Sequence, residues 1–128
     1  MSDRRSILVV DDSKLACMML QKAISSFDPE AMITIAMNGV EAMAFYDKRP
    51  ATIAIVDYNM PGMNGVEMVE ALHAAGGLSV PVVMLTTDGR PALMVRAKAA
   101  GVKGWIVKPF KPAMLRAEVQ RIVGAAGS

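Results

Sequence analysis

The stretch that decides the fold is IAIVDYNMPGMNG, residues 53–65. It opens with four apolar residues, places Asp57 at their end, and continues into a loop rich in Gly, Pro and Asn. An apolar run of this length, followed by turn residues, is typical of a buried strand that ends at a loop. Asp57 is therefore expected at a strand end, exposed to solvent and rigidly held.

Three further apolar runs end in polar residues. The first leads into Asp11-Asp12, another into Thr86-Thr87, and the last into Lys108. If all four runs are parallel strands of one sheet, carboxylates, a hydroxyl and an ammonium group meet at one edge. Open α/β sheets bind ligands at that edge, outside the carboxyl ends of the strands.

Runs of strand length alternate along the chain with stretches of helical period, which is the signature of repeated βα units and a parallel sheet. The predicted strands span residues 6–10, 32–36, 52–56, 82–85 and 103–107. Helices are predicted from the Ser13 cap to Asp28-Pro29, over 40–48, over 66–75 before Gly76-Gly77, from Pro91 to Gly101, and from Pro112 onward. Residues 124–128 are expected to be a fraying tail.

The first predicted helix has one apolar face and some apolar residues off it. The face expected to be buried contains Ala16, Met19, Leu20, Ala23, Ile24 and Phe27. Leu15 and Met18 lie off that face, on the side nearer Asp11. They are either idle exposed residues or a docking spot for a kinase or phosphotransfer helix bundle.

Composition limits the class of protein. The chain has 128 residues, 53% hydrophobic and 20% charged, which fits one ordered domain over 1–128. A lone cysteine excludes an internal disulfide and favours the cytoplasm. Neither a signal peptide nor a run long enough to span a membrane is recognisable, so no membrane association is expected.

The formal net charge of +2 hides an asymmetry. Residues 1–85 carry six basic and ten acidic residues, a net charge of −4, whereas residues 86–128 carry eight basic and two acidic residues, a net charge of +6. The late excess is either an ordinary solvated surface or a basic face for an acidic partner. Its candidates are Arg90, Arg96, Lys98, Lys103, Lys111, Arg116 and Arg121.

The polar strand ends suit phosphoryl transfer to Asp57. That chemistry needs an exposed nucleophilic oxygen, a divalent cation and fixed positive donors. Clustered carboxylates repel one another unless a cation joins them, and Mg²⁺ prefers oxygen ligands. Asp12 and Asp57 are expected to ligate Mg²⁺ directly, Asp11 through water, and Asn59 through its backbone carbonyl. Thr86 and Lys108 would hold the phosphoryl oxygens.

Each of these residues alone has an ordinary structural explanation, as a cap, a turn former, a strand residue or a surface lysine. Their joint occurrence at four strand ends favours the functional interpretation. His73, the only histidine, lacks a companion at ligand spacing and is expected on a helix surface.

Five segments together resemble the receiver domain of two-component response regulators, over essentially the whole chain. They are VVDDS at residues 9–13, NGVEA at 38–42, DYNMPGMNG at 57–65, LTT at 85–87 and KPF at 108–110. The resemblance implies a flavodoxin-like α/β fold, with a five-stranded parallel sheet in the order 2-1-3-4-5 and helices on both faces.

The resemblance also implies a function. A residue matching Asp57 takes phosphate from a phosphohistidine on a histidine kinase or phosphotransfer protein. Those matching Thr86 and Trp105 form a switch that reports to the face made by the fourth helix, fifth strand and fifth helix. Without an output domain, a monomeric, stand-alone regulator in chemotaxis or a phosphorelay is expected. It would bind a downstream, acidic protein and no nucleic acid, and would be no enzyme beyond its own Mg²⁺-dependent phosphorylation and dephosphorylation.

Three residues depart from the family pattern. Thr87 stands where a smaller residue is preferred, which predicts a tighter phosphoryl pocket. Trp105 replaces the commoner Tyr or Phe, which limits an inward swing of the ring. Asn64 replaces a usual Asp in a turn, where no consequence is expected.

Two other functions compete with this one. A phosphatase of the haloacid-dehalogenase type also uses an aspartyl nucleophile, but it needs an acid two residues later, where this chain has Asn59, and its nucleophile ends the first strand. A binder of anionic nucleotides would use the late basic residues, but the chain lacks a glycine-rich phosphate loop.

Overall fold

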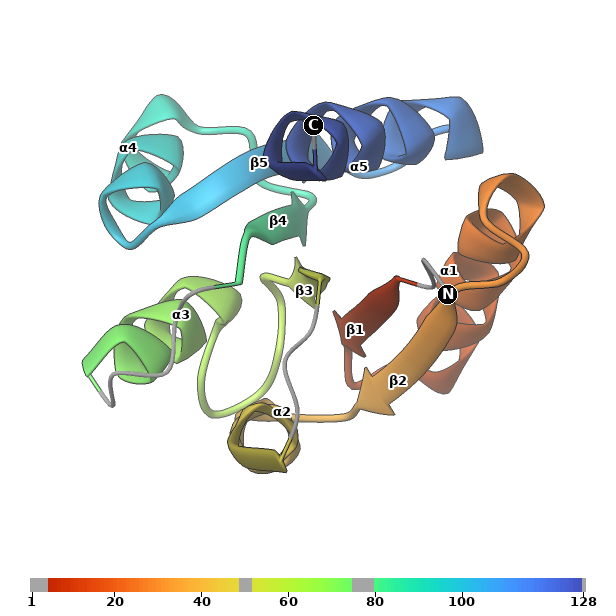
Figure 1. Cartoon of the computed structure of the whole chain (residues 1–128). Coiled ribbons are helices and arrows are strands. Elements are labelled where there is room, and N and C mark those ends of the chain that lie inside the picture. The colour runs from red at the N-terminus through yellow and green to blue at the C-terminus, as the bar shows by residue number, and fades with distance from the viewer. Residues whose placement is uncertain (1–4, 49–51, 75–79, 128) are drawn as a thin grey trace.

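The molecule is an alternation of strands and helices, seen in a computed structural model that describes residues 5–48, 52–74 and 80–127 (Figure 1). In chain order the elements are β1 (Ser6–Val10), α1 (Lys14–Phe27), β2 (Met32–Ala36), α2 (Gly39–Lys48), β3 (Ile53–Asp57), α3 (Gly65–Ala74), β4 (Val82–Thr86), α4 (Pro91–Ala99), β5 (Val102–Val107) and α5 (Pro112–Gly127).

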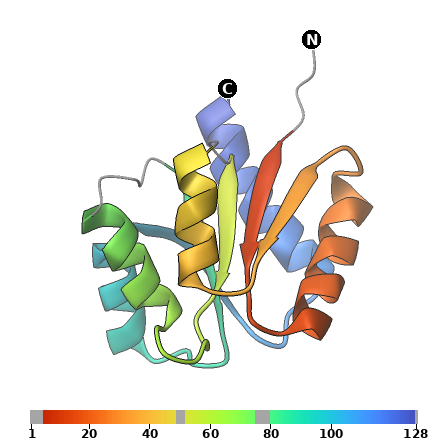
Figure 2. The ribbon, with the colours of Figure 1, turned by 90° about the horizontal axis from the view of Figure 1, so that it is seen from below.

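All five strands form one parallel sheet in the order β2-β1-β3-β4-β5. Figure 2 shows that their carboxyl ends lie at one end of the molecule, opposite the marks of the two chain ends. The predicted fold class and strand order are therefore confirmed, and the polar residues that follow the strands share one edge.

Strand alternation divides the core into two layers. In β1 and β3, Leu8, Val10, Ala54 and Val56 belong to one buried cluster, and the residues between them belong to the other. The first cluster lies under α2, α3 and α4, and the second lies under α1 and α5 (Figure 1). Both sheet faces are thus covered, which explains the nearly continuous apolar sequence of the strands.

Side-chain caps fix the starts of α1 and α3. Ser13 Oγ accepts the Ala16 N–H at 3.2 Å, as the sequence predicts. At α3, Asn64 Oδ1 accepts the Glu67 N–H at 2.9 Å, and Glu67 Oε1 accepts the Asn64 N–H at 3.0 Å. Asn64 therefore completes a reciprocal cap at the start of α3.

Some predicted bounds shift by one residue. The strands β3 and β4 include Asp57 and Thr86, and β5 already begins at Val102. Residues 124–127, which were expected to be a fraying tail, continue α5, whose last residue is Gly127. Its alanines are strong helix formers, and extending a helix costs far less than starting one. The predicted helix end at Gly76-Gly77 and residue 128 lie outside the described residues.

One prediction about α1 is also wrong. Met19 was expected on the buried face, but 65% of it is exposed. Cys17, Leu20 and Ile24 form the buried stripe instead. The helix is rotated toward Cys17, whose Sγ donates to the Asp11 carbonyl oxygen at 3.3 Å.

Candidate functional site

Backbone hydrogen bonds extend the sheet to the residues that carry the site. The Asp11 N–H donates to the Ala36 carbonyl at 3.0 Å, and the Lys108 N–H donates to the Thr86 carbonyl at 2.7 Å. The Tyr58 N–H, immediately after Asp57, donates to the Leu85 carbonyl at 2.8 Å. The functional groups therefore project from a hydrogen-bonded frame.

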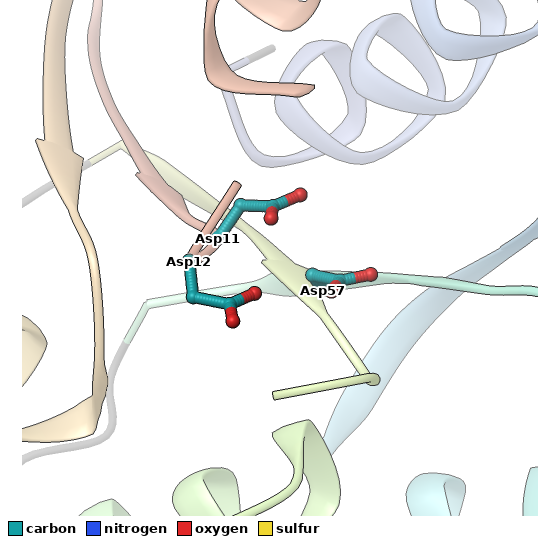
Figure 3. Close-up of side chains that lie close together, drawn as sticks. All are labelled: Asp11, Asp12 and Asp57. Atoms are coloured by element: carbon teal, nitrogen blue, oxygen red, sulfur yellow. The ribbon is translucent and has the colours of Figure 1, made fainter. Parts of the chain in front are cut away.

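Three carboxylates meet at this edge, at the ends of β1 and β3 (Figure 3). One oxygen from each of Asp11, Asp12 and Asp57 lies within 4.8 Å of the others. Asp12 is exposed, whereas Asp11 and Asp57 are buried, with 1% and 4% of their surface exposed. The expectation of an exposed Asp57 is wrong, because the residue belongs to β3 and is covered by its neighbours.

Asp11 shows the electrostatic cost of this cluster. Its Oδ1 accepts the Ser13 N–H at 2.9 Å, but its buried Oδ2 has no hydrogen-bond partner among the described residues. Burial, and then the neighbouring charge of Asp57, raise the pKa of the Asp11 carboxyl above its ordinary value. A positive charge beside Asp11 would therefore stabilise its ionised carboxylate.

Lys108 supplies part of that charge. Its Nζ lies 2.6 Å from Asp57 Oδ1, and its side chain remains 27% exposed. The peptide bond between Lys108 and Pro109 is cis. An ammonium at this distance compensates the Asp57 carboxylate and also lies where oxygens added to that carboxylate would gather.

Thr86 is fully buried at the end of β4. Its Oγ1 accepts the Asp88 N–H at 2.9 Å, which leaves the hydroxyl hydrogen as a donor. Asp88 in turn receives Arg90 Nε at 2.9 and 3.0 Å, and this hydrogen bonding lowers the pKa of the Asp88 carboxyl. The loop after Thr86 is thus fixed by the Asp88–Arg90 ion pair as well as by the hydrogen bond from the Asp88 backbone N–H to Thr86. Sequence patterns had not indicated Asp88.

Behind Asp57, the chain passes so closely that only glycine fits at position 65. A Cβ on Gly65 would lie 2.8 Å from the Asp57 carbonyl oxygen and 2.6 Å from Met84 Sδ. The Gly65 N–H also donates to the Tyr58 carbonyl at 3.0 Å. Gly65 therefore sets the path of the loop that carries Asn59, which is exposed.

The residues present fit a hard divalent cation. The donors are carboxylate oxygens from three positions, and Asp11 Oδ2 is a buried acceptor without a partner. Oxygen-only ligands are typical of Mg²⁺ and Ca²⁺, whereas zinc sites use histidine and cysteine. In the described part of the chain, no second group of three or more His, Cys, Asp or Glu residues brings its ligand atoms within 4.8 Å of one another.

A cavity of about 480 Å³ opens beside the site. Asp11, Thr87 and Lys108 line it on the polar side, and Met19 and Phe110 are among the residues on its apolar side. Thr87 is exposed at the end of β4, so its position is compatible with control of access. Leu15 and Met18 do not line this cavity, although 67% and 64% of them are exposed on the same helix.

The late basic residues divide into two groups. Arg90, Arg96 and Arg121 are engaged in ion pairs, with Asp88 at 2.7 Å, with Glu70 at 3.0 Å and with Glu118 at 3.0 Å. The other residues of the predicted partner-binding group are all exposed: Lys98, Lys103, Lys111 and Arg116. The predicted basic surface is thus partly neutralised by ion pairs within the molecule.

Trp105 lies on β5 and pairs with Met84 on β4. The next two pairs along these strands are Leu85 with Ile106 and Thr86 with Val107. The indole is partly buried against the cluster under α2, α3 and α4. Its buried Nε1–H has no acceptor among the described residues. The ring thus stands diagonally across from Thr86, which is compatible with the predicted switch pair.

His73 is exposed on α3, as expected.

Among the helices that the structure describes, none combines the length and the apolar character that crossing a membrane requires.

Comparison with known proteins identifies the family. The sequence profile of the response regulator receiver domain matches residues 7–120. Chemotaxis protein CheY1 of Helicobacter pylori is 36% identical over 120 residues, which is 92% of this chain and 96% of that protein. The CheY homologue of Campylobacter jejuni is 34% identical over 120 residues, with 92% of each chain covered.

Solved structures agree. The chemotaxis protein CheY4 of Vibrio cholerae has a TM-score of 0.84 and 35% identity, with 93% of this chain and 98% of that chain covered. With the strand order and the acidic edge, these matches show that this chain belongs to the response regulator receiver domain family and is homologous to CheY chemotaxis regulators.

Proposed function

We propose that the chain, as one receiver domain, accepts a phosphoryl group on Asp57 and thereby changes its binding to a target protein. The donor is a phosphohistidine on a histidine kinase or phosphotransfer protein. The observation that carries the proposal is the joint placement of Asp57, Lys108 and the Asp11-Asp12 carboxylates at one sheet edge. Membership in a family of signalling modules supports it.

The transfer is a displacement at phosphorus. A carboxylate oxygen of Asp57 forms the new P–O bond, the P–N bond to the histidine breaks, and its electron pair leaves with the imidazole nitrogen. Lys108 and the Thr86 hydroxyl donate hydrogen bonds to the phosphoryl oxygens. Asp11, Asp12, Asp57 and the Asn59 carbonyl would hold Mg²⁺, which when bound supplies the positive charge that these oxygens and carboxylates require.

The output is proposed to leave through the face formed by α4, β5 and α5. Thr86 ends the strand next to β5, and Trp105 lies on β5 beside Met84. A hydrogen bond from Thr86 to the phosphoryl group would draw its side chain away from α4 and free space for Trp105 to repack. Lys98, Lys103, Lys111 and Arg116 would then meet an acidic partner, while Leu15 and Met18 on α1 contact the donor.

The phosphatase alternative is not favoured. Asp57 ends the third strand, and position 59, two residues later, carries an asparagine that cannot act as a general acid. The family match also contradicts it. The CheY relatives support a role in chemotaxis. We propose that the protein acts there in the cytoplasm, as a monomer.

Intact-protein mass spectrometry tests the acceptor. With Mg²⁺ and acetyl phosphate, the wild type is expected to gain one base-labile phosphoryl group, and chelation of the metal is expected to stop the reaction. Asp57→Asn is the control, since an amide is not a nucleophile of this kind. Labelling of Asp57→Asn at the wild-type rate would contradict the assignment.

A further inference from the structure

The outer edge of the sheet at β5 is closed by two side chains of α5. Edge strands present unpaired backbone groups that other chains can pair with. Here Arg121 Nη2 donates to the Lys103 carbonyl at 2.9 Å. The next outward donor is the Trp105 N–H. The pKa of the Glu118 carboxyl is lowered mainly by its hydrogen bonds from Arg121, and a backbone hydrogen bond from Trp105 adds a smaller effect in the same direction. The pair Glu118–Arg121 therefore stands where a neighbouring strand would otherwise pair.

The carboxylate of Glu118 lies in a site shaped for it. Arg121 donates through Nε to Oε1 and through Nη2 to Oε2, both at 3.0 Å, which is the two-pronged geometry typical of carboxylate recognition. Gly104 forms the floor, because a Cβ there would lie 2.7 Å from Glu118 Oε2. A guanidinium fork, a backbone donor and a missing side chain thus hold one carboxylate against the edge of β5.

The surroundings of this site are open and basic. A groove of about 290 Å³ runs over β5 and is lined by residues of α4 and α5. Exposed Lys98 and Lys103 lie along it, with Val95 and Trp105 as apolar contacts. Glu118 is the only acidic residue among those that line the groove, so the groove is complementary to an acidic ligand.

We infer that Glu118 occupies, within the molecule, the place of a carboxylate from an extended acidic segment of the target protein. That carboxylate replaces Glu118 on Arg121 and on the Trp105 N–H, and the segment lies along the outer edge of β5. This inference rests on the proposed output role of the face formed by α4, β5 and α5. It goes beyond a general basic surface, because it assigns one arginine, one backbone donor and one internal competitor.

Two labelled peptides test the inference by fluorescence anisotropy. One alternates glutamate with valine, which favours an extended chain, and the other alternates glutamine with valine. Wild-type protein is expected to prefer the glutamate peptide. Glu118→Ala removes the internal competitor and is expected to tighten binding of the glutamate peptide about tenfold, with no gain for the glutamine peptide. The Trp105 backbone amide resonance should shift on binding.

Glu70→Ala is the matched control, because it also breaks a surface Arg–Glu pair and makes the same change in net charge. It is expected to change affinity less than about twofold. Equal tightening by Glu70→Ala, or no tightening by Glu118→Ala, would overturn the inference. Arg121→Lys keeps the charge but loses the fork, and is expected to remove most of the preference for glutamate. An unchanged preference in this variant also contradicts the inference.

These titrations need no phosphoryl group, so their failure leaves the acceptor role of Asp57 untouched. Absence of phosphoryl uptake on Asp57, together with the expected peptide binding, would contradict the proposed function alone.

Discussion

At the scale of single residues, the site combines a buried carboxylate pair with only one nearby ammonium. Asp11 is the residue that bears the cost, since its Oδ2 is buried without a partner and its pKa is raised. An ordinary structural carboxylate would be paired or exposed. A cation bound in the cluster would offset this cost, so the arrangement is consistent with a cation-binding site.

Asp11→Asn is therefore expected to stabilise the metal-free protein. The amide removes one of three clustered negative charges, and its oxygen can still accept the Ser13 N–H. In EDTA, urea denaturation should show a free energy of unfolding higher by on the order of 1–2 kcal/mol. Mg²⁺ should narrow this difference by stabilising the wild type more than the variant. A variant less stable than the wild type in EDTA would argue that the cluster is not under charge strain.

Thr87→Ala is expected to speed phosphorylation by small donors. Thr87 lines the cavity beside Asp11 and Lys108, which is the basis for the expectation that its side chain restricts the approach to Asp57. A rate increase of severalfold is expected at matched Mg²⁺, with Thr34→Ala on β2 as a control away from the site. If Thr87→Ala and wild type react at the same rate, Thr87 does not restrict access.

At the scale of elements, the loop after β3 is positioned by close backbone packing rather than by its own polar residues. Gly65 begins α3 directly behind Asp57, and the cap formed by Asn64 and Glu67 fixes the direction of the helix. The carboxylate proposed to accept the phosphoryl group is thus attached to a strand on one side and braced by a helix start on the other.

Gly65→Ala is expected to destabilise the fold by about 1–3 kcal/mol, because the new methyl group overlaps Met84 and the Asp57 carbonyl. Gly124→Ala is the matched control, since nothing lies within 4 Å of a Cβ there and alanine favours a helix. Denaturation midpoints should therefore move in opposite directions. A neutral Gly65→Ala would mean that the loop relaxes freely and does not brace Asp57.

The elements also show what a sequence can and cannot reveal. Alternation of apolar runs predicted every strand and helix, because strands buried on both faces and amphipathic helices have distinct periods. The prediction of an exposed Asp57 was wrong because β3 extends through this residue. The prediction of a buried Met19 was wrong because burial on α1 depends on how the helix rotates against the sheet. The capping of the β5 edge by Glu118 and Arg121 was also missed, because contacts between a helix and a distant strand leave no local pattern.

At the scale of the whole molecule, topology gathers chemistry from distant parts of the chain. The order β2-β1-β3-β4-β5 places β1, which precedes Asp11, beside β3, which ends in Asp57. Only β4 separates β3 from β5, which precedes Lys108. Thr86 pairs with Val107 on β5, the outer strand of the sheet, so a change at Thr86 can reach that strand. Phosphorylation at the carboxyl-end edge of the sheet can therefore alter the surface beside β5.

The charge asymmetry acquires a spatial meaning in this arrangement. The acidic first part of the chain supplies the three carboxylates proposed to hold a cation, and the basic last part supplies α4, β5 and α5. Ion pairs of Arg90, Arg96 and Arg121 reduce the free positive charge of that region. Exposed Lys98 and Lys103 line the groove at the edge of β5, where an acidic partner is proposed to bind.

The central claim is that a phosphoryl group on Asp57 changes the surroundings of Trp105. Fluorescence of this single tryptophan, recorded during addition of beryllofluoride as a phosphoryl mimic, tests it most directly. The emission is expected to change in the wild type with Mg²⁺, and to stay constant in Asp57→Asn or in EDTA. Constant emission from wild-type protein whose mass shows complete modification of Asp57 would contradict the coupling from Asp57 through Thr86 to Trp105.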